Sequence, residues 1–125
     1  MKGTESSALF AAMLTIAASV ASPVYAQDSE HGQSLFKACA ACHATDNTNR
    51  VGPGLARVVG RKAGTVPGFR YSRAMKNSGI IWDEKTLSAY LESPQEVVPG
   101  NRMPFAGMEN AQDRADLVAY LAKLK

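Results

Sequence analysis

The run Cys39-Ala40-Ala41-Cys42-His43 constrains the fold of this chain more than any other part of its sequence. Two cysteines three residues apart on a tight turn can each form a thioether with one vinyl group of a haem, and C-x-x-C-H is the attachment signature of a c-type haem. The next residue, His43, is then held under the porphyrin, where its imidazole can bind iron. The motif therefore predicts one covalently attached haem.

Three other interpretations of the motif remain open at this point. A thioredoxin-like C-x-x-C belongs to a βαβ context, and no strand pattern precedes this one. A zinc site needs four ligands; only Cys39, Cys42, His43 and His31 are available, and His43 is adjacent to Cys42. The third interpretation is a structural pair of helix cysteines beside an incidental histidine. The sequence context favours haem attachment over all three.

The first 26 residues have the pattern of an exported leader. Residues 8–21 carry no charge, but a bilayer span needs roughly 20 apolar residues, so this stretch is short for a transmembrane helix. Val24 and Ala26 place small side chains at the two positions that signal peptidase reads. We predict a signal peptide over residues 1–26, a mature domain over residues 27–125 and a periplasmic location. An uncleaved membrane anchor is the alternative.

The composition excludes several classes of protein. With 125 residues, 46% of them hydrophobic and 20% charged, the chain is long enough for one domain and too apolar for a disordered protein. Two cysteines are too few for a disulfide scaffold. The net charge of +3 comes from 14 basic and 11 acidic side chains without a dense basic run, which argues against nucleic-acid binding.

Four helical stretches, separated by loops rich in Gly and Pro, predict an all-α fold. No stretch shows the sustained alternation of a strand. We expect helices at 29–39 with Ser29 as N-cap, at 72–77, at 83–93 with Asp83 as N-cap and Pro94 as terminator, and at 110–124 with Asn110 as N-cap.

These helices cannot enclose a core by themselves. Residues 44–68 hold five glycines and two prolines, which are too many for a regular element. So long a loop argues against a simple helical bundle. Something other than helix faces must fill the middle of the domain.

The face of the iron opposite His43 needs a second ligand. His31 lies on the same predicted helix as the attachment motif and cannot easily reach over the ring. Met103 follows a Pro-Gly turn and precedes a proline, in a loop just before the last helix, and a stiffened loop suits a ligand that must not swing away. Met75 and Met108 are better interpreted as core filler.

Longer motifs extend this picture over residues 30–124. They are G-x-x-x-F-K-A-C-A-A-C-H, G-P-G-L at 52–55, G-R-K-A-G at 60–64, P-G-F-R-Y-S at 67–72, G-I-I-W at 79–82, L-S-A-Y-L-E-S-P at 87–94 and V-P-G-N-R-M-P-F-A-G at 98–107. With these motifs the chain resembles class I c-type cytochromes, in particular mitochondrial cytochrome c and its small periplasmic bacterial relatives. The resemblance implies the class I cytochrome c fold, with four to five helices and long loops around one haem c.

The resemblance implies a role for each matching residue of the haem site. Cys39 and Cys42 would hold the haem through two thioethers. His43 and Met103 would be the axial ligands of its iron. The carbonyl of Pro53 would accept the ring N–H of the histidine and so fix its orientation.

Further residues match those that surround the haem in the family. Arg61, Tyr71 and Trp82 correspond to the residues that meet the haem propionates. Tyr90 corresponds to the tyrosine near the methionine sulfur, and Phe105 to the aromatic residue beside the exposed haem edge.

Other matching positions concern packing and departures from the mitochondrial pattern. Gly32, Phe36 and Tyr120 match the contact between the first and last helices. Met75 stands where an asparagine usually joins a buried polar network, and Asn101 replaces a threonine there.

A haem with both axial positions filled by protein has no vacant site for substrate, so we interpret the chain as an electron carrier and not as an enzyme. A His/Met pair also raises the reduction potential. The alternatives are a catalytic or sensing haem, in which Met103 is absent from iron, and a dedicated electron-accepting subunit of one dehydrogenase.

The expected partners are reductase and oxidase complexes with acidic docking surfaces, met by a monomeric carrier. Residues 94–98 lack the lysines of the mitochondrial segment, so this docking surface should be less positive than that of its relative. A basic rim could still steer acidic partners. The candidate residues of this rim are Lys37, Arg70, Arg73, Lys76 and Arg102.

Overall fold

The computed structural model describes residues 3, 18, 19, 21 and 26–125. Most of the predicted signal peptide therefore lies outside the described residues. The predicted all-α class is confirmed, and within residues 26–125 the only β pairing is an isolated antiparallel bridge between Lys62 and Ile81. The helices are α1 (Ser29–Leu35), the 3-10 helix η1 (Phe36–Ala38), α2 (Arg73–Lys76), α3 (Glu84–Glu92), α4 (Pro94–Val97) and α5 (Ala111–Leu121).

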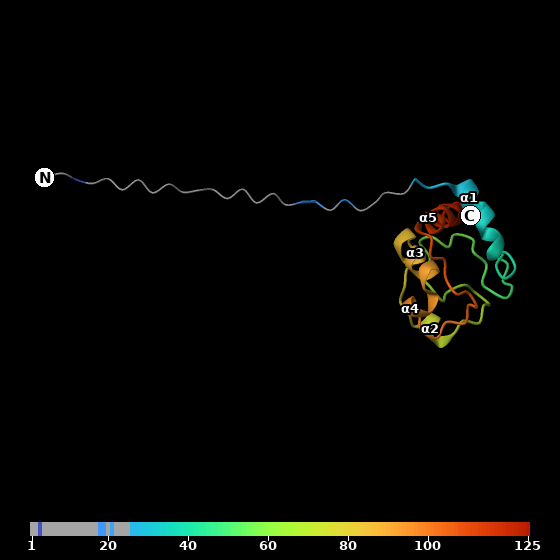
Figure 1. Ribbon diagram of the computed structural model, residues 1–125. Coiled ribbons are helices and arrows are strands. Elements are labelled where there is room, and N and C mark those ends of the chain that lie inside the picture. Colours follow the sequence, from blue (N-terminus) through green and yellow to red (C-terminus); the bar gives the residue numbers. More distant parts are fainter. Residues whose placement is uncertain (1–2, 4–17, 20, 22–25) are drawn as a thin grey trace.

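The helices are arranged around a space that the loops help to close. Figure 1 shows α1 and α5 side by side at one end of the domain, α3 next to them, and α4 and α2 toward the far end. Long loops close the remaining side. In the described part of the chain, no helix is both long enough and apolar enough to cross a membrane.

Three predicted helix starts are confirmed, since each places a side-chain acceptor on an otherwise unpaired backbone N–H. The Ser72 hydroxyl accepts from the N–H of Met75 at 3.0 Å, and Asn110 accepts from Asp113 at 3.0 Å. Asp83 and Thr86 form a reciprocal capping box.

The predicted first helix is wrong at both ends. Its N-cap is Asp28 and not Ser29, because the Asp28 carboxylate accepts from the N–H groups of Glu30 and His31 at 3.0 and 3.1 Å. The α-helix ends at Leu35, where the chain tightens into η1 before the attachment motif. The backbone N–H of Asp28 donates to the carboxylate of Asp116 at 2.8 Å, and this tertiary bond helps to hold Asp28 at the cap position.

Pro94 does more than end the third helix. It is the first residue of α4, a helix that the sequence did not predict. A proline is tolerated at this position because its missing N–H would have had no partner within the helix. The same residue therefore stops one helix and starts the next.

The contact between α1 and α5 depends on one glycine. A Cβ atom built on Gly32 would overlap the backbone carbonyl of Asp116, so the two helices approach to backbone contact at this point. One turn further along, the rings of Phe36 and Tyr120 pack with their centroids 5.4 Å apart. The match of these residues to a contact between the first and last helices is confirmed.

A buried carboxylate ties the start of the domain to α5, and the sequence did not predict it. Asp116 is 2% exposed, and its oxygens accept from the backbone N–H of Asp28 and from Gln112 Nε2, both at 2.8 Å. His31 Nδ1 lies 2.8 Å from its second oxygen. The His31 bond is the main cause that lowers the pKa of Asp116, and the same bond raises the pKa of His31.

Replacing Gly32 by alanine should destabilise the haem-loaded protein by about 3 kcal/mol, because the added methyl group must separate two helices in backbone contact. Urea unfolding followed by circular dichroism measures the loss. Gln33→Ala, on the exposed face of the same helix, should change the free energy of unfolding by less than about 0.5 kcal/mol. Equal losses in the two variants would contradict the close approach.

The pair formed by His31 and Asp116 predicts a pH window of stability. Because the pKa of His31 is raised above 6.5, its contribution is complete below that pH and is lost as pH rises through the folded-state pKa. Because the pKa of Asp116 is lowered below 3.8, its contribution is complete above that pH and is lost as pH falls through the lower folded-state value.

Asp116→Asn should therefore lose more stability at pH 5 than at pH 9, relative to the wild type, as measured by urea unfolding at both values. Asp28 and Asp113 also act on His31 and would leave a small residual dependence. Glu109→Gln, at an exposed site, is the control. A deficit of the Asp116 variant that is the same at both pH values would refute the pairing.

Candidate functional site

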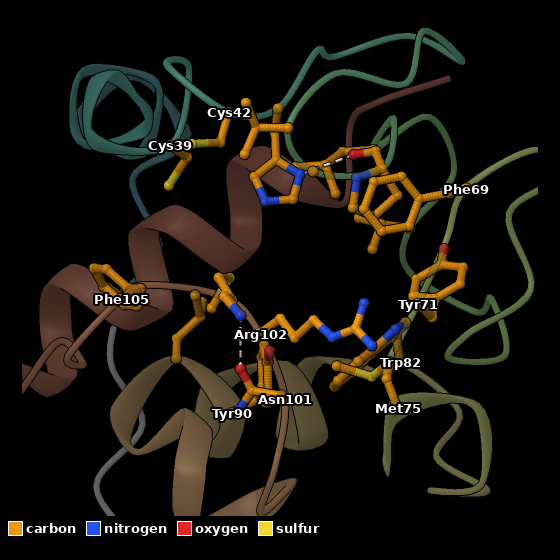
Figure 2. Close-up of a pocket in the computed structure, with 18 of the residues that line it drawn as sticks. Cys39, Cys42, Phe69, Tyr71, Met75, Trp82, Tyr90, Asn101, Arg102 and Phe105 are labelled. Atoms are coloured by element: carbon orange, nitrogen blue, oxygen red, sulfur yellow. Dashed lines mark hydrogen bonds between the residues drawn. The ribbon is translucent and has the colours of Figure 1, made fainter. Parts of the chain in front are cut away.

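A cavity of about 410 Å³ occupies the middle of the domain, within the range of roughly 300–1,000 Å³ that is typical of cofactor sites. Figure 2 shows Cys39 and Cys42 on one side of it and Tyr71 and Trp82 on the other. Every residue that the sequence nominated for the site lines this cavity. They are Cys39, Cys42, His43, Pro53, Arg61, Tyr71, Trp82, Tyr90, Met103 and Phe105.

The attachment motif forms the tight turn that its chemistry requires. After η1, the N–H groups of Cys42 and His43 both donate to the carbonyl of Cys39, at 3.0 and 2.9 Å. Both thiols are unpaired and partly buried on the cavity wall, and burial raises the pKa of the Cys39 thiol. Arg50 holds the turn from outside by donating to the carbonyl of Ala40 at 2.9 Å.

His43 is oriented by a hydrogen bond of 2.8 Å between its Nδ1 and the carbonyl oxygen of Pro53. A carbonyl can only accept, so Nδ1 carries the proton and Nε2 keeps its lone pair for a metal. Burial lowers the pKa of His43, which favours the neutral imidazole that metal ligation needs. A Cβ on Gly52 would come within 2.7 Å of both ring nitrogens, so only glycine leaves room for this ring.

Met103 stands in a loop whose first half is fixed by Asn101. This buried amide accepts from the N–H of Met103 at 2.9 Å (Figure 2). It also donates to the carbonyls of Pro94 and Val98 at 2.9 and 3.0 Å. Gln95 adds a bond from its Nε2 to the carbonyl of Asn101 at 3.0 Å. Helix α4 is thus the anchor of the methionine loop.

The second half of the same loop is fixed by Arg114, a residue that sequence reasoning missed. Its buried guanidinium donates to the carbonyls of Met108 and Glu109 at 2.8 and 2.7 Å and lies 3.4 Å from the carboxylate of Glu92. The signal was present, because Arg114 precedes Leu117 by three positions and therefore shares the buried face of α5. The arginine ties the loop end to α3 and α5.

The wall opposite the cysteines combines a cation with aromatic rings. Arg61 donates to the carbonyls of Gly54 and Ala56 at 3.1 and 2.9 Å. Burial lowers the pKa of its guanidinium, and the charge interaction with Tyr71 acts in the opposite direction and raises it. Burial also raises the pKa of Tyr71, whose hydroxyl accepts from the N–H of Val66 at 3.2 Å. This side of the cavity can therefore receive an anionic group.

Tyr90 and Trp82 form the apolar part of this wall. Their ring centroids lie 5.0 Å apart, and both side chains are buried. Burial raises the pKa of Tyr90 to about 12, so its hydroxyl stays neutral.

Two other methionines were predicted to be core filler. Met108 packs against the core, as expected. Met75 also packs against the core but in addition lines the cavity, so its predicted role was incomplete. His31, the other candidate for metal ligation, lies on Asp116 at the far side of α1 and not with the motif.

The residues that line this cavity fit a haem. Two free thiols, an imidazole whose Nε2 keeps its lone pair, a thioether and the guanidinium of Arg61 all line one largely apolar space. An all-α domain with this site is a c-type haem protein. The chain belongs to the cytochrome c family, since the family model described as Cytochrome c matches residues 29–125. It carries haem c and is an electron carrier and not an enzyme, so the catalytic alternative is not supported.

Relatives and a solved structure support the assignment. Cytochrome c2 of Rhodomicrobium vannielii is 54% identical over 104 residues, which cover 82% of this chain and 83% of that protein. Cytochrome c of Euglena viridis is 45% identical over 78% of this chain and 98% of its own length. The structure of cytochrome cH from Methylobacterium extorquens superposes with a TM-score of 0.73 at 41% identity, over 75% of this chain and 96% of that one.

The double variant Cys39→Ser/Cys42→Ser should be largely unfolded. At about 24 cal/mol per Å³, an unfilled cavity of this volume costs up to about 10 kcal/mol, which is comparable with the whole stability of a small domain. Far-ultraviolet circular dichroism and thermal melting measure the loss. Ala40→Ser keeps both thiols and should melt cooperatively; a cooperative transition in the double variant would contradict the role of haem as core.

Proposed function

We propose that this chain is a periplasmic one-electron carrier in which Cys39 and Cys42 anchor the haem and His43 and Met103 are its axial ligands. When bound, the haem supplies the one-electron couple of its iron. The observation that carries the proposal is that both candidate ligands are held by hydrogen bonds before any cofactor is considered: Nδ1 of His43 on Pro53, and the loop of Met103 on Asn101.

Fixed ligands suit electron transfer because little has to move when the charge of the iron changes. His43 cannot rotate without losing its carbonyl partner or striking Gly52. The loop of Met103 is tied at one end by Asn101 and at the other by Arg114. With both axial sides taken by protein, no position is left for a substrate, which favours a carrier over a catalytic or sensing haem.

The other wall residues receive matching roles. Arg61, Tyr71 and Trp82 would meet the propionates, because the guanidinium of Arg61 offers the positive charge that such groups need. Tyr90 would lie near the sulfur of Met103, and Phe105 would cover the haem edge. All of these side chains already face one cavity.

Delivery to the periplasm would depend on the leader. We propose that residues 1–26 are removed as a signal peptide and that residues 27–125 form the mature domain. The spacing supports this boundary, because α1 starts at Ser29 and the family match starts at the same residue. The chain would then act as a monomer in the oxidising compartment.

The partners would be reductase and oxidase proteins with acidic docking surfaces. The basic rim proposed from the sequence is exposed in all its members, and Arg70 and Arg102 also border the cavity. A positive rim at the mouth of the site would steer acidic partners toward it and make encounter rates fall with salt. The members of this rim are Lys37, Arg70, Arg73, Lys76 and Arg102.

Replacing Met103 by alanine should lower the reduction potential and let cyanide bind the ferric iron, because a His/Met pair favours ferrous iron and its loss opens one axial position. Cyclic voltammetry and a cyanide titration followed by absorption measure both effects. The weak ferric absorption band of the methionine–iron bond should disappear with them.

Met75→Ala is the matched control, since Met75 is the other methionine on the cavity wall outside the proposed ligand set. It should keep the methionine–iron band and a potential close to that of the wild type. Loss of the band in the Met75 variant, with the Met103 variant unchanged, would reverse the assignment.

A further inference from the structure

Asn49, in the loop between the attachment motif and Pro53, holds two loops together. Its Oδ1 accepts from the backbone N–H of Gly54 at 3.1 Å, and its Nδ2 donates to the carbonyl of Pro67 at 2.9 Å. An N–H can only donate and a carbonyl can only accept, so both partners agree on the orientation of the amide. The side chain is half-buried, at the junction of these segments.

The hydrogen bond from Gly54 matters because of the peptide group to which this N–H belongs. The carbonyl of the same peptide group is that of Pro53, which accepts from Nδ1 of His43 at 2.8 Å. A continuous chain of hydrogen bonds therefore runs from the His43 ring through the Pro53–Gly54 peptide to Asn49.

This peptide group is held rigidly in place. A Cβ on Gly54 would come within 2.7 Å of the backbone carbonyl carbon of Asn47, so the loop packs directly against it. The carbonyl of Gly54, which belongs to the following peptide group, accepts from Arg61 at 3.1 Å. The contact with Asn47 and the Arg61 bond thus hold the backbone on both sides of the Gly54 Cα.

We propose that Asn49 is a positioning residue that tunes His43 through this peptide, a proposal that rests on His43 being an axial ligand. Hydrogen bonds in a chain polarise one another by roughly 10–30% per bond. Donation from Gly54 to Asn49 increases the electron density on the Pro53 oxygen and strengthens its bond to the His43 N–H. A more strongly held N–H makes the imidazole a more basic ligand, which favours ferric iron and lowers the potential.

Two substitutions separate this relay from a purely structural link. Asn49→Asp keeps an acceptor for Gly54, with added negative charge, but loses the donor to Pro67. Asn49→Ala loses both. A link between loops would be broken in both variants and would move every readout in the same direction, whereas a relay is strengthened by the first substitution and weakened by the second.

The experiment uses the haem-loaded ferrous protein and measures the proton chemical shift of His43 Nδ1–H by NMR, together with the reduction potential by voltammetry. For Asn49→Asp we expect a downfield shift and a lower potential, and for Asn49→Ala an upfield shift and a higher potential. Asn47→Asp, an exposed site in the same loop with the same change of charge, is the control and should leave the proton shift unchanged.

Shifts of the same sign in both Asn49 variants would overturn the relay, as would an Asn49→Asp effect no larger than that of Asn47→Asp. Failure of the axial assignment looks different. The ring protons of His43 would then lack the large ring-current displacement of a haem ligand already in the wild type, and both proposals would fall together. Displaced ring protons without any response to Asn49 would overturn the relay alone.

Discussion

The structure depends on a cavity that its own side chains do not fill. The buried apolar residues form a shell of short helices and loop segments, and about 410 Å³ in the middle is left for the haem. A domain with so small a protein core could not be stable as a hollow shell, because the cost of such a cavity is comparable with the total stability of a small domain. Covalent attachment meets this requirement, because the haem that fills the cavity is then part of the chain.

A haem core changes what the loops must do. Long irregular segments cannot pair their carbonyls in helices or sheets, so each of those carbonyls needs another partner. Four side chains provide partners of this kind by donating to carbonyls in the loops or, for Pro94, at the start of α4. They are Asn49 to Pro67, Arg61 to Gly54 and Ala56, Asn101 to Pro94 and Val98, and Arg114 to Met108 and Glu109.

These side-chain bonds help the loops to position the proposed axial ligands, His43 and Met103. In the described part of the chain, no buried side-chain nitrogen or oxygen lacks a hydrogen-bond partner. Side-chain to backbone bonds thus help to hold the loops of His43 and Met103, together with backbone bonds such as that from the N–H of Gly52 to the carbonyl of Cys42 at 2.8 Å. A loop held by such bonds can position a side chain as accurately as a helix does. This accuracy depends on the particular amide and guanidinium side chains that make the bonds.

Motif spacing predicted the features whose partners are local, and the resemblance to class I cytochromes supplied the residues of the cavity wall. The attachment motif and the cap of Asp83 depend on neighbours within a few positions, so spacing alone predicted them. Asp116 was missed because its partners include the distant N–H of Asp28 and the ring of His31. Arg114 was missed although the carbonyls to which it donates are only five and six positions away. The prediction of Ser29 as N-cap of the first helix was wrong for a similar reason, since the bond to Asp116 that holds the observed cap, Asp28, spans 88 positions.

The two proposed axial ligands both combine local bonds with a tie to another segment. The acceptor of His43 is ten positions away, within the loop that follows the covalent anchors. The bonds around Met103 are shorter still in sequence, since Asn101 lies two positions away and donates to the carbonyl of Val98. The loop of Met103 is joined to α3 by the N–H of Met108 on the carbonyl of Leu91 at 2.8 Å and by the pair of Arg114 with Glu92. The local bonds therefore give the methionine loop its shape, and the two bonds to α3 fix where this loop lies on the cavity wall.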